Sequence, residues 1–151
     1  MTNPPAPART DAWLRAVAYG LLAEISTILT IIAVVTLYRY VFAVGRPPSE
    51  YEAFGKRAGM IVGITAGTLY TFLFARLLMC RLTVQHIAHG IVVALGAIAL
   101  SVGGSLAGHQ GLPSGYGIAS VLKLAAGAIA GALAARRGSQ VAERLVKKRA
   151  G

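Results

Sequence analysis

The most constraining feature of this sequence is a segment without formal charge that runs for 41 residues, from Leu82 to Leu122. A transmembrane helix needs about 20 predominantly apolar residues, so the segment is long enough for two crossings. Glycine, proline and polar residues gather in its middle, in GGSLAGHQGLPSGYG at positions 103–117. Because these residues favour turns, the segment is predicted to form two helices, over about 83–107 and 115–135.

Two further apolar runs precede this segment. Between Arg15 and Arg39, 23 residues carry only the charge of Glu24, and between Arg57 and Arg76, 18 residues carry none. Each run is long enough for one crossing. The predicted spans are about 14–38 and 57–78.

The connection between these two spans carries strong helix-breaking signals. Gly45 suits the end of a helix, and Pro47 and Pro48 cannot continue one. Ser49 and Glu52 have the S-x-x-E spacing of a capping box. The second helix is therefore expected to begin here, several residues before it enters the membrane.

Composition agrees with a membrane protein, since 56% of the residues are hydrophobic and only 13% are charged. The fold class predicted is an all-α integral membrane protein, with four transmembrane helices in a compact up-down bundle over residues 11–137. The Pro-rich leader 1–10 is expected to be disordered, and residues 138–151 form a basic tail. Cys80 is the single cysteine, which excludes an intramolecular disulfide. No catalytic or phosphate-binding motif is present, so we expect no enzyme activity, no cofactor and no metal.

Lysine and arginine residues are unevenly distributed between the two sides of the predicted membrane. With the N-terminus inside, ten of them flank the inner ends of the spans and four flank the outer ends. The positive-inside rule then predicts both termini in the cytoplasm of a bacterial inner membrane. Basic residues near the C-terminus are candidates for contacts with anionic lipid headgroups, or for simple anchoring. No aromatic residues alternate with them, so nucleic acid is not expected. These basic residues are Arg136, Arg137, Lys147, Lys148 and Arg149.

Small residues spaced by four predict packing faces of the glycine-zipper type. Gly59, Gly63 and Gly67 form one such face, and Gly127 and Gly131 form another. Glycine lets two helix backbones approach closely, which is how helices associate in lipid. The partner is either another helix of this chain or a second subunit in a homo-oligomer or larger membrane complex. A third set with this spacing is Ala99, Gly103 and Ala107.

Few ionisable residues lie within the predicted spans. Glu24 lies roughly 13 Å beyond Arg15 along its helix, and Lys123 lies at a similar depth from the opposite side. Because an isolated charge is costly at mid-membrane, the two are expected to pair, with Thr27 and Ser120 filling further hydrogen-bond positions. The pair is either a site that couples proton and solute movement or a structural ion pair that sets helix register.

His86 and His89 are one turn apart near the inner end of their span. They are candidates for a proton relay between Glu24 and the cytoplasm. The alternative is that they simply lie at the membrane interface. A histidine pair without carboxylate or cysteine neighbours is a weak metal signal.

The segment LLAEISTIL, residues 21–29, resembles the first helix of small multidrug-resistance transporters. The resemblance implies that Glu24 binds protons and cationic solutes in turn. The chain departs from that family in its longer first loop, in Lys123 and in its basic C-terminal tail, so we do not assign it to the family.

Two functions follow as hypotheses. The first is a non-catalytic accessory, assembly or scaffold subunit that packs through its glycine-lined helix faces. The second is a small proton-coupled transporter or ion pathway centred on Glu24, with Lys123 and the two histidines. The first is favoured, because small residues predict a closed bundle without a water-accessible route.

Overall fold

The computed structural model describes residues 9–82, 85–108, 111 and 115–150, and the side chains of residues 9–10 and 141–150 are not described. The described residues form four α-helices and contain no strand. Most of the predicted leader, residues 1–8, lies outside the described residues. The helices are α1 (Arg9–Leu37), α2 (Pro48–Met79), α3 (His86–Ala107) and α4 (Tyr116–Ala150), and α1 continues into a π-helical turn, η1 (Tyr38–Phe42).

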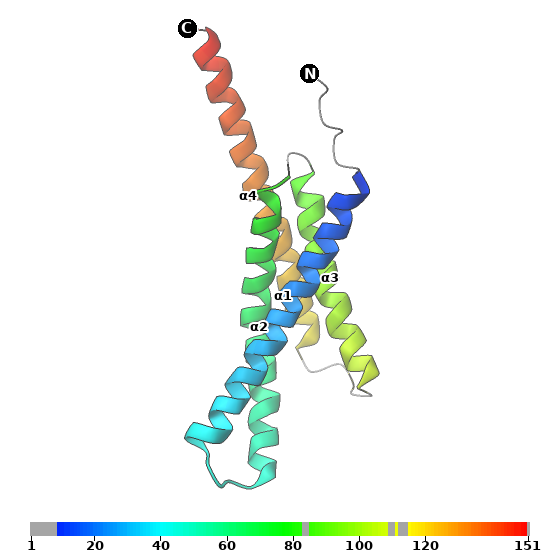
Figure 1. Ribbon diagram of the computed structural model, residues 1–151, viewed down its shortest axis with the longest axis vertical. Helices are drawn as coiled ribbons and strands as arrows, with labels where there is room; N and C mark the ends of the chain where they lie inside the picture. Colours follow the sequence, from blue (N-terminus) through cyan, green and yellow to red (C-terminus); the bar gives the residue numbers. More distant parts are fainter. Residues whose placement is uncertain (1–8, 83–84, 109–110, 112–114, 151) are drawn as a thin grey trace.

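The four helices pack lengthwise against each other and alternate in direction (Figure 1). α1 and α4 each contact both α2 and α3, so α1 and α4 occupy opposite corners of the bundle. The start of α1 and the α2–α3 connection lie at one end, which we call the terminal end, and α4 extends beyond the bundle there. The α1–α2 and α3–α4 connections lie at the other end, which we call the hairpin end.

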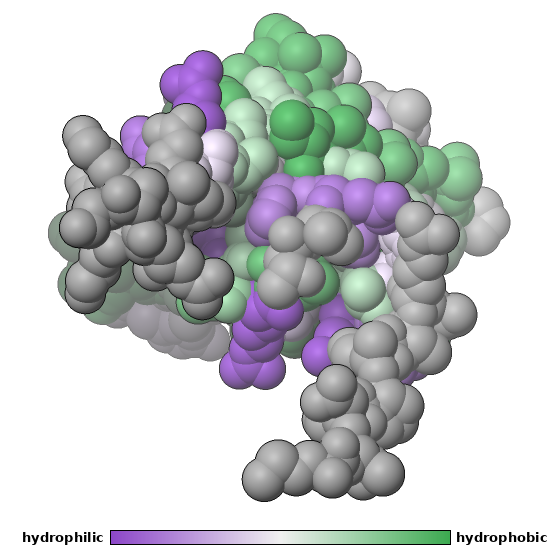
Figure 2. Space-filling view, turned by 90° about the horizontal axis from the view of Figure 1, so that it is seen from above, coloured by the Kyte–Doolittle hydropathy of each residue, from purple (hydrophilic) through white to green (hydrophobic). Residues whose placement is uncertain are grey.

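Each helix is long and apolar enough to cross a membrane, as the sequence predicts. Large apolar side chains point away from the bundle on every helix, for example Leu29, Ile61, Leu95 and Ile129, which are 50 to 60% exposed. Seen from the terminal end, hydrophilic residues gather on the end face and hydrophobic residues cover the flank (Figure 2). An apolar flank of this extent is suited to lipid rather than water, which is consistent with a multi-pass membrane protein.

The helix break between α1 and α2 falls where the sequence predicts it, but the residue that caps the start of α2 is a different one. Gly45 adopts φ +78°, a left-handed conformation that glycine reaches without strain. Pro47 is the N-cap residue of α2 and Pro48 its first helical residue, with no side-chain cap hydrogen bond. The predicted capping box at Ser49 is therefore wrong, because proline at the first helical position starts the helix two residues earlier.

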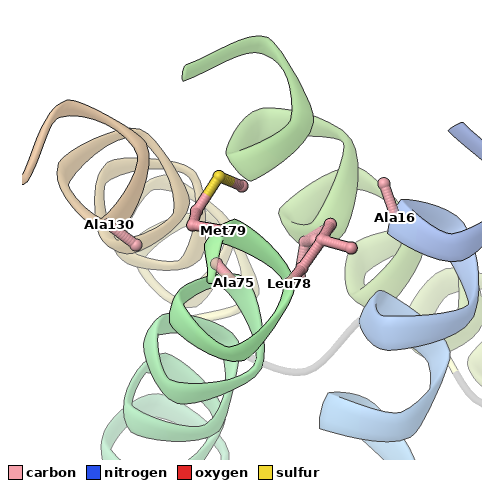
Figure 3. Close-up of a cluster of buried hydrophobic side chains, with 6 residues drawn as sticks. Ala16, Ala75, Leu78, Met79 and Ala130 are labelled. Carbon is pink, nitrogen blue, oxygen red and sulfur yellow. The ribbon is translucent and has the colours of Figure 1, made fainter. Parts of the chain in front are cut away.

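The terminal half of the bundle is closed by a small apolar core (Figure 3). Alanine is common in this core, so the helix axes come close together. The buried residues of the cluster come from all four helices and are Ala16, Ala75, Leu78, Met79, Val93 and Ala130.

Two glycine crossings adjoin this core. Gly20 of α1 faces Gly96 of α3, and Gly90 of α3 faces Gly127 of α4. At Gly20, Gly90 and Gly127 an added Cβ would overlap the backbone carbonyl of the opposite helix. Close backbone contact therefore fixes α3 against both α1 and α4 in this half of the molecule.

Candidate functional site: a cavity that ends on a buried ion pair

Glu24 and Lys123 form a buried ion pair across the bundle interior. The Nζ of Lys123 lies 2.5 Å from the Oε2 of Glu24, and the two side chains are 5% and 8% exposed. Because α1 and α4 lie at opposite corners, this contact spans the bundle and is the pairing expected from the depths of the two residues. It satisfies two charges that would be costly if left alone in lipid.

Ser101 of α3 completes the ion pair, and the sequence interpretation missed it. Its hydroxyl donates to the Oε1 of Glu24, and the Nζ of Lys123 lies 3.4 Å from the Ser101 Oγ. Both carboxylate oxygens of Glu24 therefore accept a hydrogen bond. Ser101 and Ser105, four residues apart in an apolar span, were the available signal, since that spacing places two hydroxyls on one helix face.

Gly67 of α2 makes room for the lysine stem. A Cβ at this position would lie 2.9 Å from the Cε of Lys123 and 3.5 Å from the Cγ2 of Thr27. The glycine thus allows the long side chain of Lys123 to lie inside the bundle. Of the predicted packing face on α2, this is the member that contacts another helix.

A cavity of about 440 Å³ extends from the hairpin end to the ion pair and is lined by all four helices. Gly108 and Gly115, at the ends of α3 and α4 where these helices connect, are part of its lining, as are Glu24 and Lys123 further inside. Lys123 lies eight residues from Gly115, which corresponds to a depth of roughly 12 Å. The lining combines hydroxyl-bearing and apolar side chains: Thr27, Ser101, Ser105, Tyr116 and Ser120 with Ile28, Ile31, Met60, Ile64 and Leu100.

Gly59 and Gly63 line this cavity instead of packing against a helix. A Cβ at either position would meet nothing within 4 Å. Of the two alternatives for this face, packing against another helix of the chain does not occur at these two glycines, because α2 turns them toward the hollow between the helices. Gly127 and Gly131 do pack, against Gly90 and against the backbone of His86 and Ile87, respectively.

Thr27 and Ser120, the two predicted hydroxyl partners, both lie beside the ion pair. The Oγ1 of Thr27 donates to the carbonyl of Ala23 in its own helix at 2.9 Å. The Oγ of Ser120 is buried and makes no hydrogen bond of standard geometry among the described residues, although it has a weaker contact with the side chain of Tyr116. A buried hydroxyl without a standard hydrogen bond is uncommon in native structures and is a candidate for a ligand contact.

The structure does not bring His86 and His89 to the ion pair. His86 Nε2 lies 3.0 Å from the carbonyl oxygen of Leu82, and His89 Nδ1 lies 2.9 Å from that of Gln85. His89 stacks on Trp13, with ring centroids 4.1 Å apart. His89 precedes Ser101 by 12 residues, or roughly 18 Å of helix, and neither histidine lines the cavity.

The basic residues proposed to contact lipid lie on the part of α4 that leaves the bundle (Figure 1). Arg136 and Arg137 are exposed. Lys147, Lys148 and Arg149 belong to the stretch whose side chains lie outside the description.

A second, shallow hollow lies at the α1–α2 connection, where the guanidinium of Arg39 is 5.7 Å from the ring centroid of Tyr40 and 5.5 Å from that of Tyr51. Arg46 beside it pairs with Glu50 at 2.9 Å, which raises the pKa of Arg46. Aromatic and arginine side chains of this kind are common at membrane interfaces.

Comparison with protein-family models, with curated proteins and with solved structures gives no significant match.

Proposed function

We propose that the protein is a small proton-coupled solute transporter whose binding site is the cavity between the hairpin end and the Glu24–Lys123 ion pair. The observation that carries the proposal is the shape of the interior. The cavity reaches the buried pair from the hairpin end, whereas the apolar core fills the terminal half. A hollow that lies toward one end of the bundle, with a packed core in the other half, suits a transporter that exposes its site to one side of the membrane at a time.

The cavity also removes the reason for favouring an accessory subunit. That preference depended on small residues closing the bundle, but Gly59 and Gly63 leave space instead of filling it. A hollow of about 440 Å³ with several hydroxyls in its lining is within the usual size range of small-molecule sites.

In this proposal Glu24 is the titrating group. Glu24 exchanges a proton for the cationic group of a solute, so a proton and a solute compete for the same carboxylate. The histidines lie away from the pair and have no assigned part in this step.

The proposal places the molecule in a bacterial inner membrane with both termini cytoplasmic, as the distribution of lysine and arginine favours. The hairpin end, and the cavity with it, then faces outward. Arg136, Arg137 and the basic end of α4 are then positioned to contact anionic headgroups of the inner leaflet.

Transport is tested with purified protein in vesicles that contain a pH-sensitive dye. A mixture of small amino acids, amines and carboxylic acids is added outside, and protein-free vesicles correct for passive permeation. We expect the wild type to change the internal pH beyond that background. Glu24→Gln and Gly63→Leu should abolish the difference, the first by removing the titrating group and the second by filling the cavity.

Gly117→Leu is the matched control for Gly63→Leu. Gly117 is exposed, a Cβ there meets nothing within 4 Å, and it is not part of the cavity lining. The control should keep wild-type flux. Folded wild-type protein that moves no protons with any solute would refute the transporter proposal.

An accessory or scaffold role is the second candidate, and one observation favours it. Ala99, Gly103 and Ala107 are exposed on α3, and a Cβ at Gly103 meets nothing within 4 Å. This small-residue face packs against no other helix in the part of the chain that the structure describes, and it is suited to close contact with another helix. Light scattering in mild detergent should then give a mass above the monomer for the wild type and a monomer for Gly103→Leu. A monomeric wild type without a co-purifying partner would remove this candidate.

A further inference from the structure

The charges at the inner end of the cavity cancel, and this limits which solute can bind there. Glu24 and Lys123 carry opposite charges, and Ser101 links them with hydrogen bonds to both. Both are almost fully buried. Any ligand that reaches them must either leave the pair intact or provide a partner for each charge it separates.

A singly charged solute fails this requirement as long as Glu24 and Lys123 both keep their charges. A cation that binds Glu24 displaces Lys123 and leaves a buried ammonium without a partner. An anion that binds Lys123 leaves the ionised carboxylate of Glu24 buried without a partner. An unpaired charge at this depth is strongly unfavourable, so single ions compete poorly with the existing pair.

A zwitterion meets the requirement, because its ammonium can pair with Glu24 while its carboxylate pairs with Lys123. The Ser120 hydroxyl provides a further donor for that carboxylate. It lies one turn before Lys123 beside the cavity, its oxygen makes no hydrogen bond of standard geometry among the described residues, and rotation about χ1 redirects it. Ile28, Ile31 and Ile64 in the lining then surround an apolar substituent.

We infer that the cavity binds small zwitterions with an apolar side chain, of the amino-acid type. The inference rests on the proposed transport function and specifies its substrate class. Recognition comes from two charge-assisted contacts that replace the internal ion pair, and selectivity for size comes from the apolar walls.

Isothermal titration calorimetry of the purified protein in detergent tests this with two matched sets of probes. L-leucine is compared with 3-methylbutylamine, which lacks the carboxylate, and with 4-methylpentanoate, which lacks the ammonium. L-alanine is compared in the same way with ethylamine and propionate. At least one of the two zwitterions should bind at least tenfold more tightly than both of its singly charged analogues. An amine or an acid that binds as tightly as its parent amino acid would overturn the inference.

A serine variant tests the assigned contact without breaking the ion pair. Ser120→Ala should weaken binding of the zwitterion about tenfold, as expected for loss of a hydrogen bond to a charged group. Ser139→Ala is the control, because this exposed serine on α4 hydrogen-bonds only to its own helix. Equal affinities of the two variants would contradict the role of Ser120.

The vesicle assay separates failure of this inference from failure of the transport proposal. If neither zwitterion binds but amines or acids still drive proton movement through the wild type, the transporter stands and the zwitterion class falls. If no solute moves protons, the transport proposal falls, and the calorimetry alone decides whether the cavity binds zwitterions.

Discussion

The glycine crossing at the terminal end gives a quantitative prediction for Gly131→Ala. A Cβ at Gly131 would lie 2.6 Å from the carbonyl oxygen of His86 and 2.6 Å from the Cα of Ile87, both backbone atoms of α3. Ordinary contact begins at about 3.4 Å, so α4 must move away by about 0.8 Å. Overpacking of this kind costs about 1–3 kcal/mol of unfolding free energy.

Gly63→Ala is the matched control. Gly63 also lies within a long apolar helix, but a Cβ there meets nothing within 4 Å. The expected change is within about 0.5 kcal/mol, since no neighbour has to move. The two variants add the same methyl group, so their difference isolates the contact with the α3 backbone.

Titration with sodium dodecyl sulfate in mixed micelles measures both values. Trp13 is the single tryptophan and stacks on His89 at the terminal end, so its fluorescence reports separation of α1 from α3. Far-UV circular dichroism reports loss of helix independently. If Gly131→Ala and Gly63→Ala change the unfolding free energy equally, the argument from close helix contact is refuted.

Two further changes probe the ion pair in the same titration. Glu24→Gln should lower the unfolding free energy by about 3–5 kcal/mol, because it leaves the Lys123 ammonium buried without its partner. Adding Lys123→Met should recover most of that free energy. A double variant whose loss of stability equals the sum of the two single variants would contradict the pairing. Gly67→Ala should lower the unfolding free energy less than Gly131→Ala does, because the added methyl group meets the flexible stem of Lys123 and not a helix backbone. A larger loss of unfolding free energy for Gly67→Ala would show that the lysine stem has no room to move.

The spans could be predicted because each depends on a single local property. An uncharged run of about 20 residues is long enough to cross a bilayer, and the runs in this sequence correspond to the four helices. Helix ends are less predictable, since water tolerates both helix and coil outside the membrane. Accordingly α1 begins at Arg9 and α4 continues to Ala150, well beyond the predicted crossings.

The contact between Glu24 and Lys123 could be anticipated because depth along a helix follows from residue number. Two opposite charges at the same depth have few other partners in lipid. Ser101 could not be assigned in this way, because serine is tolerated on any face of a membrane helix. Whether its face meets α1 depends on the rotation of α3, which packing determines.

The glycines illustrate the limit of pattern alone. Gly59 and Gly63 have the same spacing as Gly127 and Gly131, yet the first pair lines a cavity and the second packs against α3. A missing side chain creates space in both cases. Neighbouring helices determine whether that space is filled by backbone or left open.

The sequence by itself determined that four segments are long and apolar enough to cross a membrane and that two opposite charges lie at a similar depth within them, because hydrophobic length and position along a helix are properties of each segment. Only the tertiary structure decided where the bundle is closed and where it is hollow. That outcome depends on the crossings at Gly20–Gly96 and Gly90–Gly127, which bring α1, α3 and α4 together in the terminal half, while the half beyond the ion pair retains a cavity. The position of a crossing is set jointly by the surfaces of two helices, and neither sequence segment contains that information alone.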